Sequence, residues 1–323
     1  MKYNHLGKSG LEVSELSFGS WITFGSNLRF DPVKESVKCA YEAGVNFFDT
    51  AEIYAHGEAE SLLGKAIKEL KIKREEVVIS TKLFWGGQAP NQTGLSRKHL
   101  IEGTKNSLRR LKMDYVDLIY CHRPDPNTPL EETVFAMDNI VRSGLAFYWG
   151  TSEWPADKIE AAHQFAKEYK LIPPTMEQPE YNMFSRVKVE KDYLPLYEKY
   201  GMGTTTWSPL ASGILTGKYN KGIPKGSRMD RVSWLKAEFD NYKMFSEEVF
   251  HKIDKLTEIA RDLGCSMTQL ALAWCLTNKH VSTVIIGASN KDQLKENLKS
   301  AEIKEKVTPD ILVKIDHILQ NKP

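Results

Sequence analysis

Three consecutive apolar runs of the chain each end on, or just before, an ionisable side chain: Asp49, Lys82 and His122 in turn. A tyrosine, Tyr54, follows the first of them five residues later. This set suits the reduction of a carbonyl group, because the charge that develops on the carbonyl oxygen needs a proton donor beside it. Tyr54 is the candidate donor. A Lys82 ammonium would lower the pKa of its phenol from the usual ~10, Asp49 would hold Lys82 charged, and His122 would donate a hydrogen bond to the oxygen.

Each of these four residues also has an ordinary structural interpretation. Asp49 could cap the segment after it, Tyr54 could be a core tyrosine, Lys82 a surface lysine and His122 a loop histidine. Their joint placement at three consecutive strand ends favours one shared pocket, since the strand ends of a parallel barrel meet at one face. An aldolase-type site with Lys82 as Schiff-base nucleophile is a different chemistry, but Asp49 and Tyr54 suit hydride transfer better.

Strands and helices alternate along residues 1–323 without a break in composition. This predicts an α/β chain that folds as a single domain, a (β/α)8 TIM barrel with an N-terminal β-hairpin and extended loops at its C-terminal face. The hairpin is expected at 3–14, and the strands at 16–19, 46–49, 77–82, 116–121, 146–150, 175–178, 203–207 and 281–286. Helices are expected at 32–43 (capped by Asp31), 59–70, 97–111 (capped by Ser96), 130–143, 156–169, 187–200, 247–263, 268–277, 291–301 and 309–319, with a long loop over 209–231.

The composition of the chain and the motifs it lacks argue against several other classes of protein. The only Gly-x-Gly, at 201–203, precedes a strand instead of following one, so an open dinucleotide-binding sheet is not expected. A formal net charge of +2, with 27% charged residues, argues against a nucleic-acid partner. The four cysteines lack metal-ligand spacing, so no metal site is predicted. Neither a signal peptide nor an apolar run of ~18 residues is present, which predicts a cytoplasmic protein without membrane insertion.

Two loops near the end of the predicted barrel have the character of phosphate sites, which barrels often place after strands seven and eight. The seventh strand is followed by small residues whose amides can approach a pyrophosphate, namely Ser208, Pro209, Leu210, Ala211, Ser212 and Gly213. Lys218 and Arg228 come further on and can supply positive charge. The eighth strand is followed by 287–290 and then a helix, whose N-terminus is an anion site. An ordinary Gly/Ser loop and N-cap explain these stretches equally well.

The four candidate residues resemble the catalytic tetrad of the aldo-keto reductases, and the resemblance covers nearly the whole chain. It is closest to the branch that contains the voltage-gated potassium-channel β subunits and their plant and bacterial relatives. The segments that carry it are 84–87 (FWGG), 122–129 (HRPDPNTP), 148–152 (YWGTS) and 285–290 (IIGASN). The resemblance implies NADPH-dependent reduction of aldehydes and ketones to alcohols in a (β/α)8 barrel.

The resemblance also implies how NADPH or NADP+ is held. Arg228, Ser289 and Gln293 would hold the 2′-phosphate, with Gly287 beside them, and Glu296 and Asn297 would hold the adenine end. Ser152 and Gln178 would bind the nicotinamide carboxamide, with Trp207 beside the ring and Ser20, Trp21 and Asp49 at the same end. The aromatics Trp21, Trp85 and Trp154 are either core packing or an apolar substrate wall around Tyr54 and His122.

Two residues depart from the animal channel subunits that this branch includes. Position 122 is histidine where those subunits carry asparagine, which favours catalysis, and position 153 is glutamate where they carry arginine. The chain also begins almost at the barrel, so the long N-terminal extension of some channel subunits is not expected. The alternative function is a potassium-channel β-type regulatory subunit that uses bound NADP(H) as a redox sensor. The resemblance also implies a homo-oligomer, for which a tetramer is one candidate form. The alternative function adds tetramers that bind an ion-channel partner.

Overall fold

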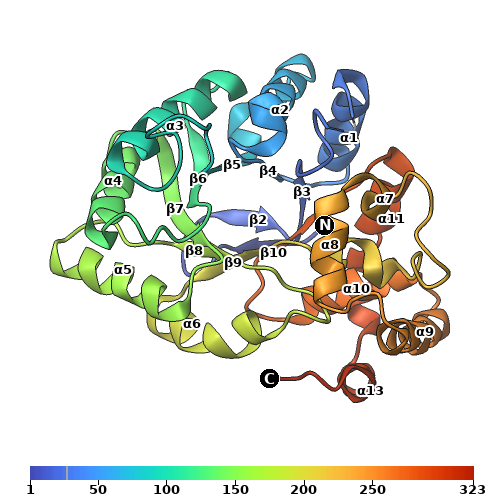
Figure 1. Cartoon of the computed structure of the whole chain (residues 1–323). Helices are drawn as coiled ribbons and strands as arrows, with labels where there is room; N and C mark the ends of the chain where they lie inside the picture. The colour runs from blue at the N-terminus through green and yellow to red at the C-terminus, as the bar shows by residue number, and fades with distance from the viewer. Residues whose placement is uncertain (27) are drawn as a thin grey trace.

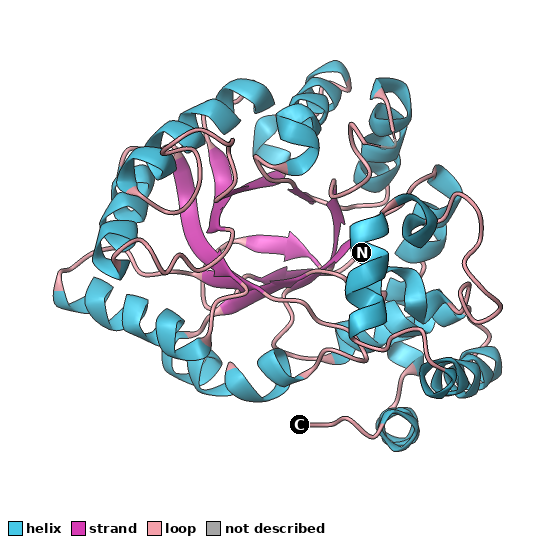
Figure 2. Ribbon diagram, viewed as in Figure 1, coloured by secondary structure: helices cyan, strands magenta, loops and turns pink. Residues whose placement is uncertain are grey.

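The computed structural model describes residues 1–26 and 28–323, and its centre is a closed barrel of eight parallel strands. Each strand pairs with the next along the chain, and the last pairs with the first, so the (β/α)8 prediction is confirmed. Figure 2 shows the ring of strands enclosed by helices. The strands are β3 (Leu16–Gly19), β4 (Phe47–Asp49), β5 (Val78–Leu83), β6 (Val116–Cys121), β7 (Ala146–Ser152), β8 (Met176–Gln178), β9 (Gly203–Thr206) and β10 (Thr283–Ile286).

Alternation along the strands decides which side chains enter the barrel, because successive residues of a strand point to opposite faces. In β5, Val78 packs inside the barrel, and Ser80 and Lys82 hydrogen-bond within it. Ile79 and Leu83, on the opposite face of the strand, belong to the apolar layer between barrel and helices. A strand of this pattern therefore delivers polar groups to the barrel interior while its other face anchors the helices.

The N-terminal hairpin, β1 (Tyr3–His5) and β2 (Glu12–Ser14), closes one end of the barrel, as predicted. Leu6 and Val13 pack with strand residues such as Phe47 and Leu118 in a separate interior cluster. The backbone N–H of Ser14 donates to Oδ1 of Asn46, just before β4, at 2.7 Å. The plug therefore lies at the N-terminal ends of the strands, which leaves the opposite end open (Figure 1).

The helices between residues 30 and 200 follow one another around the outside of the barrel in chain order, and the later helices gather on the side of β10 (Figure 1). Ser96 caps its helix as predicted, accepting from the backbone N–H of His99 at 3.2 Å. Among the described residues, no helix is long and apolar enough to cross a membrane. The α-helices are α1 (Phe30–Glu42), α2 (Glu58–Glu69), α3 (Arg97–Leu111), α4 (Leu130–Arg142), α5 (Ala156–Glu168), α6 (Leu194–Tyr200), α7 (Arg228–Arg231), α8 (Ser233–Asn241), α9 (Glu247–Asp262), α10 (Met267–Thr277), α11 (Lys291–Leu298), α12 (Ser300–Ile303) and α13 (Pro309–Leu319).

Several helix boundaries differ from the sequence prediction. α1 begins at Phe30, so Asp31 lies in its first turn and Arg29 occupies the cap position. The helix expected at 187–200 is divided into a π-helical turn, η3 (Lys188–Asp192), and α6, because Pro195 at the start of α6 has no N–H to continue the ladder. The helix expected at 291–301 is likewise two, α11 and α12.

The long loop expected at 209–231 is more structured than its composition indicates. It contains a 3-10 segment, η4 (Ala211–Thr216), and α7, and the unpredicted α8 follows it. Trp234 of α8 lies 6.5 Å, centroid to centroid, from the ring of Trp21 after β3. Contact with a distant aromatic stabilises this segment, and such a contact leaves no local sequence signal.

Candidate active site

The four candidate catalytic residues come together at the open end of the barrel. Asp49 is the last residue of β4, Lys82 is next to last in β5, and His122 follows β6 directly. Tyr54 begins a 3-10 turn, η1 (Tyr54–Gly57), after β4. The Lys82 ammonium donates to Asp49 Oδ2 at 2.6 Å and to Tyr54 Oη at 3.2 Å. Lys82 thus joins the carboxylate to the phenol, in the arrangement that the sequence predicted.

The Asp49–Lys82 pair is held by a shell of further hydrogen bonds. Lys82 also donates to the backbone oxygen of Thr50 at 2.8 Å. The other oxygen of Asp49 accepts from Ser80 Oγ at 2.6 Å and from Gln178 Nε2 at 3.1 Å. Lys82 has no exposed surface and Asp49 is 3% exposed. A buried ion pair with its remaining donors and acceptors satisfied is rigid, so it places the Lys82 charge accurately.

Burial and charge set the protonation states of the site. Burial raises the pKa of the Tyr54 phenol, and the Lys82 ammonium beside it only partly opposes that effect. The predicted lowering of the Tyr54 pKa is therefore wrong for this structure, because desolvation of the phenolate outweighs the attraction of the ammonium. Burial is the strongest single influence on Lys82 and disfavours its ammonium, but Asp49 and Tyr54 together outweigh burial, so the pKa of Lys82 is raised. At neutral pH, Tyr54 carries its proton and Lys82 its charge.

His122 is neutral at physiological pH. Burial, followed by the nearby charges of Lys82 and Arg123, lowers its pKa well below the usual value. Nδ1 is enclosed and finds no hydrogen-bond partner in the described part of the chain. An enclosed N–H without a partner is rarer than an enclosed acceptor, so the tautomer with the proton on Nε2 fits best. The ring contacts Tyr54 and Trp85, with centroids 5.9 and 5.1 Å away.

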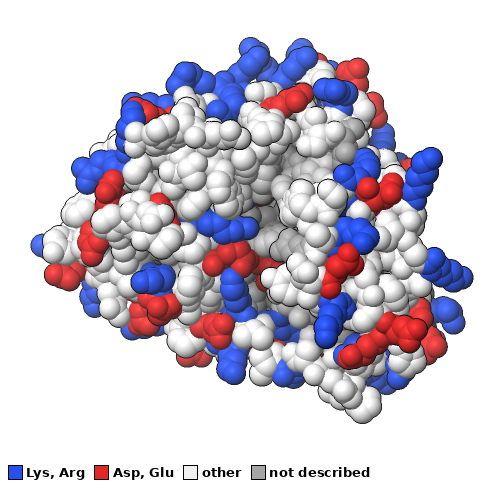
Figure 3. All heavy atoms as spheres, in the orientation of Figure 1, with Lys and Arg blue, Asp and Glu red and all other residues white. Residues whose placement is uncertain are grey.

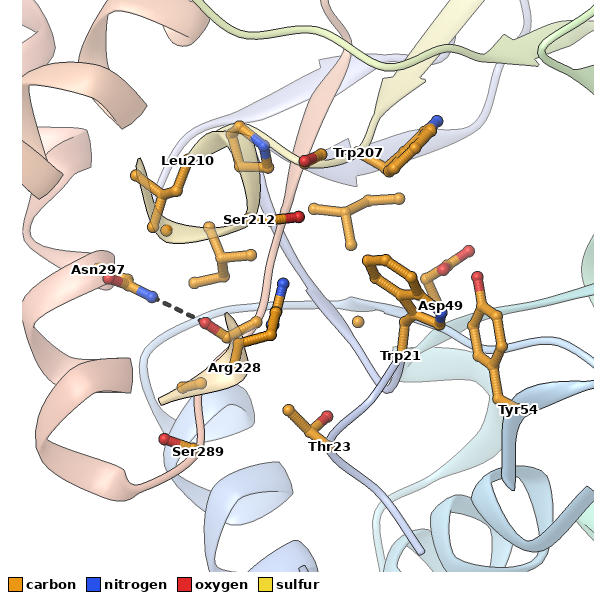
Figure 4. A pocket seen from close by; sticks show the side chains of 18 of the residues that line it. Trp21, Thr23, Asp49, Tyr54, Trp207, Leu210, Ser212, Arg228, Ser289 and Asn297 are labelled. Carbon is orange, nitrogen blue, oxygen red and sulfur yellow. Dashed lines mark hydrogen bonds between the residues drawn. The ribbon is translucent and has the colours of Figure 1, made fainter. Parts of the chain in front are cut away.

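The tetrad opens into a cavity of about 580 Å³. In the space-filling view of this face, a hollow lies near the middle (Figure 3). In close-up, Asp49 and Tyr54 lie at one end, and Arg228, Ser289 and Asn297 lie toward the other (Figure 4). The predicted residues that line it are Trp21, Asp49, Tyr54, Trp85, His122, Ser152, Gln178, Trp207, Ser208, Pro209, Leu210, Ser212, Gly213, Lys218, Arg228, Gly287, Ser289, Gln293, Glu296 and Asn297.

Glu153 follows Ser152 in the chain but, unlike Ser152, it does not line the cavity. Its carboxylate is paired with Lys188 and accepts from the Trp207 indole at 3.0 Å and from the Glu180 backbone N–H at 2.5 Å. The ion pair with Lys188 balances its charge. Through its hydrogen bond with the indole, the Glu153 side chain holds the Trp207 ring, and that ring lines the cavity.

The far end of the cavity is positively charged. Lys218 and Arg228 line it, and neither forms an ion pair with the described side chains. Burial, together with the charges of Arg228 and Arg231, lowers the pKa of Lys218. Beside them η4 bends through Ser212 and Gly213, with φ of 53° and 99°, so that its backbone approaches the cavity closely. Clustered cations without an acidic partner are a site for a polyanion.

The N-terminus of α11 borders the same end. Asn290 caps this helix by accepting from the Gln293 backbone N–H at 2.9 Å. The Ser289 hydroxyl donates to Gln293 Oε1 at 2.8 Å, and Asn297 Nδ2 donates to the backbone oxygen of Gly287 at 3.1 Å (Figure 4). The helix dipole and these polar side chains favour an anion next to Arg228.

Three predicted contact residues do not line the cavity. Trp154, expected in a substrate wall, is 3% exposed and packs in the apolar layer around the barrel. Ser20 and Ala211 are also buried, at 1% and 2% exposure. The catalytic candidate Lys82 does not line the cavity either, but it donates to Tyr54, which does. The lining residues that the prediction omitted are Gly19, Thr23, Ile53, Arg123, Thr216, Gly226, Ser227, Arg231, Trp234, Thr268, Ile285, Ile286 and Ala288. Among these residues, Arg123 could have been predicted from the sequence, because it follows His122 directly in the motif at 122–129.

Comparison with known proteins agrees with this geometry. A family model described as "Aldo/keto reductase family" matches residues 15–319. The chain is 53% identical over 329 residues to a protein of Arabidopsis thaliana described as "Probable voltage-gated potassium channel subunit beta". It is 51% identical over 329 residues to an Oryza sativa subsp. japonica protein of the same description. Each alignment covers 100% of this chain and 98% of the relative.

Proposed function

The chain belongs to the aldo/keto reductase family of oxidoreductases, and on that premise we propose that it reduces aldehydes and ketones to alcohols with NADPH. The observation that carries the proposal is the position of Lys82, whose ammonium bridges Asp49 and Tyr54 beneath the cavity. A buried ammonium at a phenol stabilises the phenolate that remains after proton transfer. This arrangement suits a tyrosine that gives a proton to a carbonyl oxygen and regains it afterwards.

In this proposal Tyr54 protonates the carbonyl oxygen and His122 donates a hydrogen bond to it. Because burial keeps the phenol protonated, Tyr54 is ready to donate throughout the neutral pH range. The neutral imidazole of His122 stabilises negative charge on the oxygen without competing as the acid. Trp21 and Trp85 provide apolar walls that exclude water from the reacting group.

The cavity fits a nicotinamide dinucleotide. Its far end offers Lys218 and Arg228, which form no ion pair with the described side chains, and its near end offers the Ser152 hydroxyl, the Gln178 amide and the Trp207 ring. When bound, the reduced nicotinamide supplies the hydride for the carbonyl carbon. The preference for NADPH over NADH rests on Arg228, Ser289 and Gln293, since a guanidinium beside hydroxyl and amide groups suits a 2′-phosphate.

Tyr54→Phe tests the proposal. With NADPH and 4-nitrobenzaldehyde, loss of nicotinamide absorbance should proceed in the wild type and be almost abolished in the variant, because no proton donor remains. NADPH affinity, measured by tryptophan fluorescence, should stay nearly unchanged. Tyr148→Phe is the matched control, because this tyrosine packs against the interior cluster at the plugged end of the barrel. Reduction at the wild-type rate by Tyr54→Phe would refute the role of Tyr54.

The second candidate is a potassium-channel β-type regulatory subunit that senses the redox state of its bound cofactor. The descriptions of the two plant relatives favour it. Under this candidate the chain is a cytoplasmic homo-oligomer, expected to be a tetramer, that associates with a channel. Light scattering tests the assembly, and co-purification with a plant voltage-gated potassium channel tests the partner. A monomer that does not co-purify, yet turns over aldehydes, would reject this candidate and retain the first.

A further inference from the structure

Arg123 is a cavity residue that neither the tetrad nor the phosphate end requires. It follows His122 directly and is half-buried at the reacting end of the cavity. One terminal nitrogen, Nη1, donates to the backbone oxygen of His122 at 2.6 Å and to Ser152 Oγ at 3.3 Å. The guanidinium carbon lies 5.6 Å from the centroid of the Trp85 ring. These contacts fix the plane of the guanidinium beside the reacting group.

The charge of Arg123 is not balanced by any side chain that the structure describes. No carboxylate of the described residues forms an ion pair with it. Asp49, which holds Lys82 beneath Tyr54, and Glu153, which follows Ser152, are each paired with a lysine, Lys82 and Lys188 respectively. Because Tyr54 and His122 are neutral, Arg123 gives the substrate end of the cavity one positive charge that no described carboxylate pairs with.

The guanidinium also has donors to spare. Arginine has five N–H groups, and they form a planar fork that matches a carboxylate. Only Nη1 of Arg123 donates to the part of the chain that the structure describes, so Nε and Nη2 remain available. A half-buried guanidinium without an acidic partner is costly, and an anionic ligand removes that cost.

The cofactor's phosphates do not account for this charge. Arg228 lies toward the opposite end, with Trp21 between it and Tyr54 and Asp49 (Figure 4). Lys218 belongs with Arg228, whose charge lowers the pKa of Lys218. A ligand that reaches Arg123 instead contacts Trp85 and His122, the predicted substrate walls. The guanidinium of Arg123 is therefore placed where the carbonyl substrate, and not the cofactor's phosphates, can contact it.

We propose that Arg123 binds a carboxylate on the substrate, so that the protein prefers carbonyl compounds that carry an acidic group within about one aromatic ring of the carbonyl. This proposal rests on the proposed reductase function. The product would be the corresponding hydroxy acid, formed by adding a hydride and a proton across the C=O bond, while the carboxylate stays unchanged on Arg123.

The test compares 4-carboxybenzaldehyde with its methyl ester, which differ in charge but present the same aldehyde. In the wild type, kcat/KM should be about 10- to 100-fold higher for the acid, the range expected for hydrogen bonds to a charged group. Arg123→Gln should remove this preference, and Arg123→Lys should restore part of it. With NADP+ bound, calorimetry should show that 4-(hydroxymethyl)benzoate binds the wild type more tightly than Arg123→Gln.

Two results would overturn the proposal. One is a wild-type enzyme that treats the acid and the ester alike. The other is an Arg123→Gln variant that slows both substrates equally, which would make Arg123 a positioning residue for Ser152. Failure of the proposed function looks different, since neither aldehyde would then be reduced. Binding of 4-(hydroxymethyl)benzoate that is lost in Arg123→Gln would, even then, support the anion site by itself.

Discussion

Replacing Lys82 by methionine should cost stability as well as activity, because the lysine neutralises a buried carboxylate. In Lys82→Met, Asp49 would keep only the donors of Ser80 and Gln178. Removing one partner of a buried ion pair typically destabilises a protein by about 3–5 kcal/mol. Neutral donors do not replace an ammonium at 2.6 Å, so we expect about 4 kcal/mol at about pH 7.

This loss should shrink as the pH falls. The folded variant can relieve the buried charge by taking up a proton on Asp49, whereas an aspartate in the unfolded chain ionises near pH ~3.9. Holding that proton costs about 1.4 kcal/mol per pH unit above this value, or about 1.5 kcal/mol at about pH 5. Stability is therefore lost as pH rises, and the destabilisation by Lys82→Met should be more than twofold larger at about pH 7 than at about pH 5.

Urea denaturation followed by tryptophan fluorescence at both pH values measures this effect. The double variant Asp49→Asn/Lys82→Met should recover much of the loss at about pH 7, because no buried charge remains. Lys98→Met is the matched control, since Lys98 pairs with Glu102 on the surface at 57% exposure. It should cost less than ~1 kcal/mol. A Lys82→Met midpoint equal to the wild type, or a loss independent of pH, would refute the inference that the pair is coupled and buried.

The remaining predictions concern single sites. His122→Asn should slow single-turnover hydride transfer, by at most the roughly 10²–10³-fold that complete loss of an oxyanion donor costs, because the asparagine amide still donates a weaker hydrogen bond. NADPH affinity should stay nearly unchanged, and an unchanged rate would remove His122 from the mechanism. Arg228→Glu should weaken NADPH binding far more than NADH binding, measured as the two dissociation constants, and equal wild-type affinities would contradict the 2′-phosphate role. Burial raises the pKa of Glu177 to about 8. The folded wild type therefore keeps a proton that the unfolded chain loses, and its stability falls between about pH 5 and pH 8. The melting temperature of Glu177→Gln relative to wild type should rise over that range, and a constant difference would show that Glu177 is already ionised at the lower pH.

The identity of the catalytic residues was available in the sequence because it depends on local order. A strand's end is marked by its apolar run, and parallel strands of a barrel all end at one face. Asp49, Lys82 and His122 could thus be placed together without knowing any distance. Alternation in β5 likewise placed Ser80 and Lys82 on one side of the strand. The family motifs then indicated the dinucleotide end, where Arg228 and Ser289 do line the same cavity.

What surrounds each of these residues was decided only by the tertiary structure. Trp85 and Trp154 both follow strands and are the same residue type, yet only Trp85 lines the cavity. Glu153, the residue before Trp154, has a φ of 62°. Glutamate rarely adopts this left-handed conformation, so the turn could not be predicted from the sequence.

The electrostatics of the site depended on the fold for the same reason. The sequence placed an ammonium near Tyr54, which by itself lowers a phenol's pKa. Burial by walls from distant segments reverses the sign. Likewise, Gln178 supports Asp49 across 129 residues of chain. Arg123 has no ion-pair partner among the described residues, where Asp49 and Glu153 are paired with Lys82 and Lys188. Solvation and charge pairing are properties of a residue's whole surroundings, so the sequence could say which groups meet but not in which ionisation state they meet.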